Sequence, residues 1–279
     1  MIPFEFAYLR PEALREAVAA YREFEAAGKT AMYYAGGSEI ITMSRAGAIR
    51  PDAVIDVKNI PDLNALSVDG DGLTLGAALT LNRIKESRLF PLLTLASGRI
   101  ADHTNQCRIT LGGNLCGTII YRETSLPLML SDARVTLFGP DGERTAPFES
   151  VFLGRMRLKP GELVVRVFVP AWALTARHAH IKKTANEKID YPLVNATALW
   201  KDGALRIAFS GLAAQPLRSP EVEAILNDRG VTPQSRAEGA ARLLAECAHS
   251  DVEGSKAYRL FVVRNTLKRL LEDWENGAV

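Results

Sequence analysis

Two pairs of adjacent glycines are the residues best suited to hold a ligand in this chain. The first pair lies in Ala35-Gly36-Gly37-Ser38-Glu39, between a short buried strand expected at residues 31–35 and a helix that begins near residue 40. Successive backbone N–H groups at the start of a helix bind phosphate without any lysine. The spacing is neither GxGxxG nor that of a P-loop, so a plain tight turn is the alternative.

The second pair lies in Leu111-Gly112-Gly113-Asn114-Leu115, which we expect to be a glycine-centred turn. Taken alone, it is equally a bulge or a corner between two apolar stretches. Two such loops in one chain, the first of them before a helix, favour a cradle that holds a long diphosphate ligand at two points.

The other reactive side chains form no complete catalytic or metal-binding pattern. His103 and Cys107 are four residues apart, but a closed metal site needs further ligands and a nucleophilic pair needs a third, orienting group. The cysteines, which also include Cys116 and Cys247, contain no CxxC spacing and are odd in number. We therefore expect no metal ligand in this chain, and no catalytic nucleophile can be named from these residues.

Two charged dipeptides have a surface interpretation and a site interpretation. Arg122 and Glu123 are interpreted as a local surface ion pair, which contributes little to stability. Lys182 and Lys183 are interpreted as a solvated pair, with one buried, anion-facing lysine as the alternative.

Composition narrows the class of protein. The chain has 279 residues, with 34 Lys and Arg against 32 Asp and Glu, and this near-neutral balance gives no reason to expect a nucleic-acid partner. A hydrophobic fraction of 47% is enough for a sizeable core. No stretch reaches the ~18 apolar residues of a membrane span, and the N-terminus does not read as a signal peptide. We expect a cytoplasmic protein.

The elements that must position these residues are mixed helices and strands. We expect a helix from Pro11 to Gly28, a hairpin around residues 69–72, a helix over about 90–101, a strand pair at 193–200 and 205–209, and two terminal helices. Because strict βαβ alternation is absent, the pattern favours an α+β fold over a doubly wound sheet.

The order of several motifs resembles one family. Residues 35–40 resemble its first flavin motif, which is AGGT followed by an acidic or amide residue. Residues 75–80 resemble its LGAAVT strand, and residues 109–115 resemble its second motif, GTIGGNI/L. Residues 159–163 resemble its L-x-PGEL turn. Residues 50–63 resemble the segment that follows the first motif. The chain is thereby identified as a member of the FAD-binding (medium) subunits of molybdenum hydroxylases, which include those of xanthine dehydrogenase and carbon monoxide dehydrogenase.

The resemblance implies a fold and a division into domains. Residues 1–172 would form an FAD-binding fold of the vanillyl-alcohol-oxidase or PCMH type, made of two α+β subdomains at about 1–56 and 57–172. Residues 173–279 would form a C-terminal domain with a small antiparallel sheet and helices.

The resemblance also implies a function, a cofactor and partners. The chain would be a flavoprotein oxidoreductase subunit that binds FAD noncovalently and receives electrons from a separate [2Fe-2S] subunit. That subunit receives them from a molybdopterin-binding large subunit, and FAD passes them to NAD or another acceptor. A purine or xanthine dehydrogenase is one such assembly.

Motif correspondence places the cofactor-binding residues. The diphosphate loop would comprise Tyr33, Tyr34, Ala35, Gly36, Gly37, Ser38, Glu39 and Ile40. Further contacts with the diphosphate, the flavin or the adenine would come from Ala101, Ile109, Thr110, Gly113, Asn114, Thr118, Val164 and Lys182.

The chain departs from the family after the second motif. Where relatives carry SD-x-x-P, this sequence reads Arg122-Glu123-Thr124-Ser125-Leu126-Pro127, and Glu123 is the best replacement for the flavin-contacting Asp. Two alternatives to the subunit interpretation stay open: a stand-alone FAD oxidoreductase on the same fold, and a scaffold subunit that has lost its flavin. A visible spectrum separates the scaffold from the other two.

Overall fold

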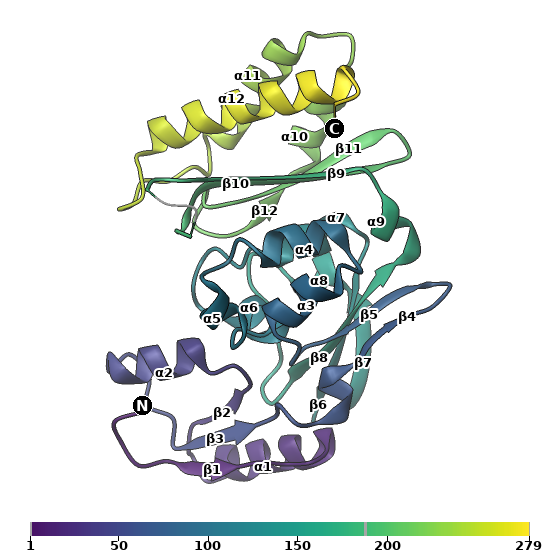
Figure 1. Ribbon diagram of the computed structural model, residues 1–279. Coiled ribbons are helices and arrows are strands. Elements are labelled where there is room, and N and C mark those ends of the chain that lie inside the picture. Colours follow the sequence, from purple (N-terminus) through teal and green to yellow (C-terminus); the bar gives the residue numbers. More distant parts are fainter. Residues whose placement is uncertain (1, 187–188, 279) are drawn as a thin grey trace.

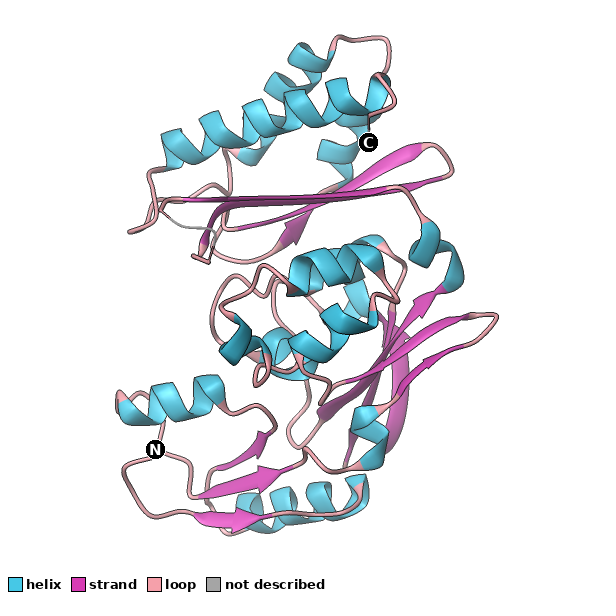
Figure 2. Ribbon diagram, viewed as in Figure 1, coloured by secondary structure: helices cyan, strands magenta, loops and turns pink. Residues whose placement is uncertain are grey.

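The structure, a computed structural model, describes residues 2–186 and 189–278. Its helices and strands form three tiers, each built around one sheet (Figure 1). One sheet is parallel and the other two are antiparallel, and helices pack beside all three (Figure 2). This mixture confirms the α+β fold class.

The first tier is a small parallel sheet. Its strands β1 (Ala7–Leu9), β3 (Ala53–Asp56) and β2 (Ala31–Tyr34) lie in the order β1-β3-β2. Helices α1 (Leu14–Ala26) and α2 (Ser38–Arg45) connect them on opposite sides of the sheet (Figure 1). The expected absence of βαβ alternation is therefore wrong for this tier, because the three-residue strand β1 was too short to be recognised.

The second tier is a five-stranded antiparallel sheet in the order β4-β5-β8-β6-β7. The strands are β4 (Leu66–Val68), β5 (Gly72–Gly76), β6 (Arg134–Gly139), β7 (Gly142–Pro147) and β8 (Leu163–Pro170), with the 3-10 helix η1 (Pro61–Asn64). The hairpin expected around residues 69–72 joins β4 to β5.

Short helices surround that sheet. They are α3 (Leu81–Ser87), α4 (Pro91–Ser97), α5 (His103–Gln106), α6 (Leu111–Cys116), α7 (Ser125–Leu130) and α8 (Phe148–Val151). The helix expected over about 90–101 is α4, which ends earlier because Gly98 caps it. All six residues of α7 are buried, so this helix is part of the core.

The third tier follows the linking helix α9 (Ala171–Thr175). Its sheet, in the order β12-β11-β10-β9, contains β9 (His178–Thr184), β10 (Pro192–Lys201), β11 (Ala204–Ser210) and β12 (Leu217–Arg218). Helices α10 (Pro220–Asn227), α11 (Pro233–Leu244) and α12 (Lys256–Glu275) cover one face (Figure 1). The strand pair expected at 193–200 and 205–209 is confirmed, whereas the described chain ends in three helices rather than two.

The two faces of the third sheet differ in chemistry. Ala196, Ala198 and Trp200 point to the helices and form a separate apolar core with them. Their neighbours on the other face include buried Asn195 and Thr197, and that face lies over the second tier. The junction between these tiers is therefore mixed, because Leu199 and Ala208 on the same face pack into the apolar core of the second tier. In the part of the chain that the structure describes, we find no helix with the length and apolarity needed to cross a membrane.

Candidate functional site

The first glycine loop turns the chain sharply from β2 into α2. Gly37, the N-cap residue of α2, has a φ of +72°, which is in the left-handed region that favours glycine. A Cβ on Gly36 would lie 1.9 Å from the carbonyl oxygen of Arg108. The loop therefore needs one glycine for its backbone conformation and the other for close packing.

Among the described residues, no side chain caps the start of α2. Gly37 supplies no side chain to cap the first turn. The hydroxyl Oγ of Ser38 is buried and has no hydrogen-bond partner among the described residues. Because uncapped amides and an unpaired hydroxyl favour an acceptor, this end of α2 has the donors that a phosphate group needs.

The second glycine pair is not the turn that we expected. Thr110 begins the short helix α6, and its Oγ1 accepts a hydrogen bond from the amide of Gly113 (3.2 Å). The amides of Leu111 and Gly112 donate to the carbonyls of Leu79 (2.9 Å) and Ala77 (2.8 Å). The donors of this first turn are therefore already paired within the protein.

The two glycine loops lie against each other although about 75 residues separate them. Besides the Arg108 carbonyl packed on Gly36, the carboxylate of Glu39 joins them. It accepts hydrogen bonds from the amide (2.6 Å) and Oγ1 (2.8 Å) of Thr118 and from the amide of Ile119 (3.3 Å). The residues assigned to the diphosphate loop and to the second motif thus come together at one place.

A second part of the candidate site is the loop that contains Ala101. Ala101 has a φ of +51°, which is uncommon for a residue with a side chain. The buried amide of Gln106 holds the loop, since its Nε2 donates to the carbonyls of Gly98 (3.3 Å), Ile100 (3.1 Å) and Ala101 (3.0 Å). The sequence analysis missed Gln106, and no local pattern marks it.

A buried ion pair connects the second tier to the third. Lys182 Nζ donates to Glu123 Oε1 (2.8 Å) and to the carbonyl of Arg99 (2.8 Å), while Asn195 Nδ2 donates to Glu123 Oε2 (2.7 Å). Burial raises the pKa of Glu123, and the ammonium of Lys182 opposes that shift. The two residues that the family resemblance singled out are therefore direct partners.

This pairing corrects two expectations. Arg122 does not pair with Glu123; it donates to the carbonyls of Gly117 (2.8 Å) and Gly154 (2.9 Å). Lys182 is buried and faces the carboxylate of Glu123, as in the alternative of one buried, anion-facing lysine, whereas its neighbour Lys183 is exposed. Both errors have one cause, since residues 59 positions apart meet only in the folded chain.

Asn114 connects the second glycine loop to the segment that carries Glu123. Its Oδ1 accepts from the amide (3.2 Å) and Oγ1 (2.6 Å) of Thr124. On the other side of the ion pair, His180 Nδ1 lies 3.0 Å from Thr197 Oγ1. Burial, with nearby Arg99 and Lys182, lowers the pKa of His180 to about 3, so this imidazole is neutral.

The remaining assigned residues have structural contacts of their own. The hydroxyl of Tyr33 donates to the carbonyl of Gly161 (2.8 Å), and its ring stacks on Tyr21. The ring of Tyr34 lies beside Gly37 and 4.6 Å from the ammonium of Lys58. Val164 lies in the core of the second tier. Partly buried residues complete the two loops: Ala35, Ile40 and Ile109.

The His103 and Cys107 side chains lie 3.8 Å apart on the surface. Over residues 2–186 and 189–278, no three His, Cys, Asp or Glu side chains gather closely enough to hold a metal ion.

Comparison with protein families gives two adjacent matches. The model described as the FAD binding domain in molybdopterin dehydrogenase matches residues 4–172. The model described as the CO dehydrogenase flavoprotein C-terminal domain matches residues 179–274. Together they account for all three tiers.

Individual proteins resemble the chain over nearly its whole length. The carbon monoxide dehydrogenase medium chain of Hydrogenophaga pseudoflava is 28% identical, covering 97% of this chain and 97% of its own. The xanthine dehydrogenase FAD-binding subunit of Escherichia coli O157:H7 is 24% identical, covering 97% and 96%. A solved structure of the Hydrogenophaga pseudoflava enzyme superposes with a TM-score of 0.83 at 27% identity, covering 96% of both chains. The chain belongs to the family of FAD-binding medium subunits of molybdenum hydroxylases.

Proposed function

We propose that this chain is the FAD-carrying electron-transfer subunit of a heteromeric molybdenum hydroxylase. Residues 1–172 hold the cofactor noncovalently, with subdomains at about 1–56 and 57–172, and residues 173–279 form the C-terminal domain. The observation that carries the proposal is the uncapped start of α2, where the buried Ser38 hydroxyl has no partner among the described residues.

The chain's residues bind and position the cofactor in this proposal. The first-turn amides of α2 and the hydroxyl of Ser38 donate to the diphosphate. Asn114, Glu123 and Lys182 position the flavin end through their contacts at the junction of the second and third tiers. Bound FAD supplies the electron transfer itself, so the protein needs no nucleophile or general base.

The partners follow from the kind of protein that this chain resembles. Relatives are named medium chains, and we propose that a [2Fe-2S] subunit and a molybdopterin-binding subunit complete the assembly. NAD is the electron acceptor to test first. The hydroxylated substrate belongs to the molybdopterin subunit, and we propose purines and carbon monoxide for testing, because relatives named for xanthine and for carbon monoxide are similarly close.

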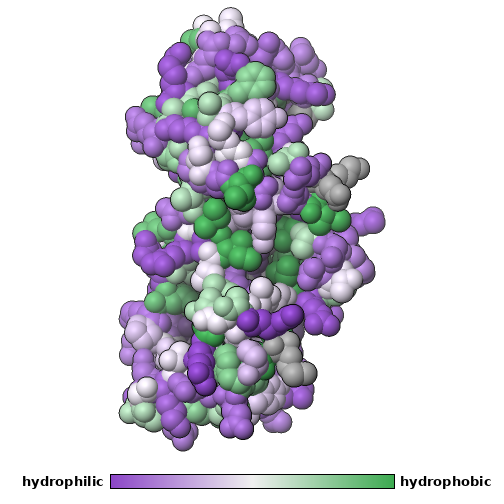
Figure 3. Space-filling model, turned by 90° about the vertical axis from the view of Figure 1, so that its left-hand side faces the viewer, coloured by the Kyte–Doolittle hydropathy of each residue, from purple (hydrophilic) through white to green (hydrophobic). Residues whose placement is uncertain are grey.

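An apolar area beside the site suits the docking of the iron–sulfur subunit. Hydrophobic side chains gather across the middle of the face in Figure 3, with polar side chains above and below. Exposed Ile119 lies two residues before Tyr121, whose ring stacks on exposed Tyr191 with ring centroids 4.6 Å apart. Exposed Leu153 precedes Gly154, whose carbonyl accepts a hydrogen bond from Arg122. Apolar contacts of this kind suit a stable subunit interface.

Flavin analysis of the purified chain tests the proposal. We expect flavin absorption bands, and acid precipitation should release FAD into the supernatant. FMN alone, or flavin retained on the pellet, would contradict noncovalent FAD binding, and a colourless protein that binds no added FAD would favour the scaffold alternative.

Reconstitution tests the partnership. The isolated chain should not oxidise purines, aldehydes or carbon monoxide with NAD, and activity should appear when the two other subunits are added. Leu153→Asp should weaken this assembly while FAD content stays unchanged. Turnover by the single chain would instead favour the stand-alone oxidoreductase.

A further inference from the structure

Helix α7 lies between the candidate FAD site and the C-terminal sheet. Just before its first residue, Thr124 holds Asn114 and Glu123 pairs with Lys182. The helix itself is buried along its whole length and lies below the third sheet (Figure 1). Its amino-terminal end is thus in direct contact with residues that we assign to FAD binding.

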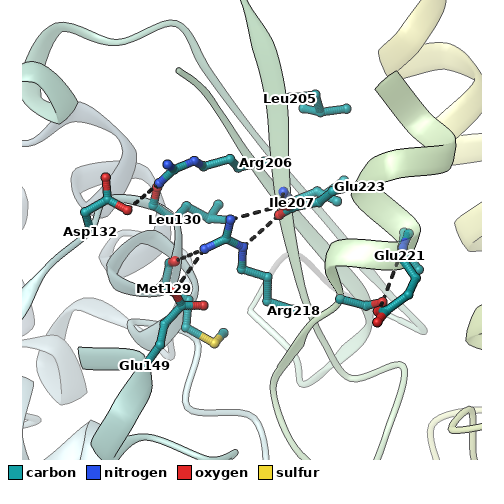
Figure 4. Close-up of polar contacts among 12 residues, drawn as sticks. Met129, Leu130, Asp132, Glu149, Leu205, Arg206, Ile207, Arg218, Glu221 and Glu223 are labelled. Atoms are coloured by element: carbon teal, nitrogen blue, oxygen red, sulfur yellow. Dashed lines mark hydrogen bonds and ion pairs between the residues drawn. The ribbon is translucent and has the colours of Figure 1, made fainter. Parts of the chain in front are cut away.

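Two arginines of the C-terminal sheet hold the opposite end of α7 (Figure 4). Arg218 Nη1 donates to the carbonyl of Met129 (2.9 Å), and Arg206 Nη1 donates to the carbonyl of Leu130 (3.0 Å). These carbonyls belong to the last turn of α7, where the carbonyl oxygens of a helix have no N–H partner within the helix. The sheet therefore satisfies the free carbonyls of α7.

Carboxylates fix both arginines in place. Glu223 binds Arg218 through two hydrogen bonds (2.8 and 3.0 Å), and its Oε1 also accepts from the amide of Ile207 (2.9 Å). Asp132, just beyond α7, accepts from Arg206 (2.6 Å) and from Lys201 (2.7 Å). A two-bond arginine–carboxylate contact permits one geometry, so this end of α7 is held rigidly.

We propose that Arg206 and Arg218 are positioning residues for the FAD site, acting through α7. This inference rests on the proposed function. A six-residue helix is only about 9 Å long, and a buried helix moves as one body. Displacement of its carboxyl-terminal end therefore moves Thr124 and Glu123, and with them their partners Asn114 and Lys182.

Arg206→Met is the sharper test of the two arginines. It removes the bond to Leu130, while Lys201 still pairs with Asp132, so no buried charge is left alone. Arg206→Lys retains a donor for the same carbonyl. Arg269→Met, at an exposed arginine on α12, is the matched control.

The measurements are the FAD dissociation constant and the visible circular dichroism of bound FAD, both well below the melting temperature. Arg206→Met should weaken FAD binding roughly 2- to 30-fold and change the dichroism, as expected for coupling between sites. Arg206→Lys should restore much of both, and Arg269→Met should change neither.

Two results separate the inference from the function on which it rests. If wild-type protein binds FAD but Arg206→Met changes only the melting temperature, the arginine is structural and the positioning role is wrong. If wild-type protein binds no FAD, the proposed function itself fails, and the inference fails with it.

Discussion

The two glycine loops look alike in sequence but differ in what their glycines do. At the first loop, the helix that follows begins without a side-chain cap and with an unpaired buried hydroxyl, Ser38 Oγ, among the described residues. At the second loop, Thr110 caps the helix, and the carbonyls of Leu79 and Ala77 accept its first amides. The first loop is open to a ligand, whereas the second is satisfied by the protein itself.

This difference shows that the role of a glycine pair depends on the residues packed around it. Gly37 is needed for a left-handed backbone. Gly112 is needed because a Cβ there would lie 2.9 Å from the Cβ of Ala77, so that α6 can pack closely. Substitutions should therefore separate ligand binding at the first loop from folding at the second.

The largest effect should come from Gly37→Val. The side chain would strain the backbone and obstruct the amides of α2, so FAD binding should weaken at least about 100-fold, equivalent to roughly 2.7 kcal/mol. Titration of the apo protein with FAD measures this. Gly28→Val, at a φ of +70° with open space around it, controls for backbone strain alone, because a Cβ on Gly37 would also lie 2.1 Å from the ring of Tyr34. Stoichiometric FAD in the Gly37 variant would show that the loop is merely a turn.

The next effect should be on folding rather than on binding. Gly112→Val overpacks the contact with Ala77 and should lower the free energy of unfolding by about 2 kcal/mol. Denaturant unfolding of the apo protein gives this value. Gly70→Val, at a glycine with open surroundings, should change it little. The contrast between the loops would collapse if Gly112→Val abolished FAD binding without loss of stability.

A smaller loss of stability should follow from Thr110→Val. This change removes the N-cap of α6, which typically contributes about 1 kcal/mol. Thr232→Val removes a comparable cap from α11, far from the site, and should lower stability similarly. FAD affinity should stay the same in both variants. A loss of tenfold or more in the Thr110 variant alone would show that α6 contacts the ligand directly, although its first-turn amides are paired within the protein.

The smallest effect should come from Ser38→Ala, which should change the stability of the apo protein and the affinity for FAD in different ways. Without ligand, removing an unpaired buried hydroxyl should leave stability unchanged or slightly raised. FAD affinity should nevertheless fall roughly 5-fold, because one donor to the diphosphate is lost. Ser44→Ala, on the same helix and at a hydroxyl that also has no partner among the described residues, should not alter affinity. Equal affinities for the two variants would remove Ser38 from the site.

The sequence predicted the features that depend on neighbouring residues. The strand, glycine pair and helix of the first loop follow one another directly, as do the hairpin around residues 69–72 and the strands of the third sheet. The second loop was mistaken for a turn because glycine disfavours helices, and only the Thr110 cap and the Ala77 contact outweigh that preference.

Features that depend on distant residues were missed. The Glu123–Lys182 pair joins positions 59 residues apart, and Gln106 holds its loop through carbonyls that no local pattern marks. Two omissions did have a local signal. Ser219-Pro220 is a good start for the overlooked helix α10, and Asn195 and Thr197 are polar residues in the middle of a mainly apolar strand.

The hydrogen bonds between the C-terminal sheet and the second tier have a consequence for how these two tiers fit together. Two apolar faces can shift relative to each other and still bury a similar area. Hydrogen bonds, by contrast, are lost when their partners shift by about 1–2 Å. Ser210 Oγ donates to the carbonyl of Tyr121 (2.6 Å), and Asn195 donates to Glu123 on the same face. These contacts select one docking alignment of the sheet, and so they fix where Glu123 lies relative to Lys182 and Asn195.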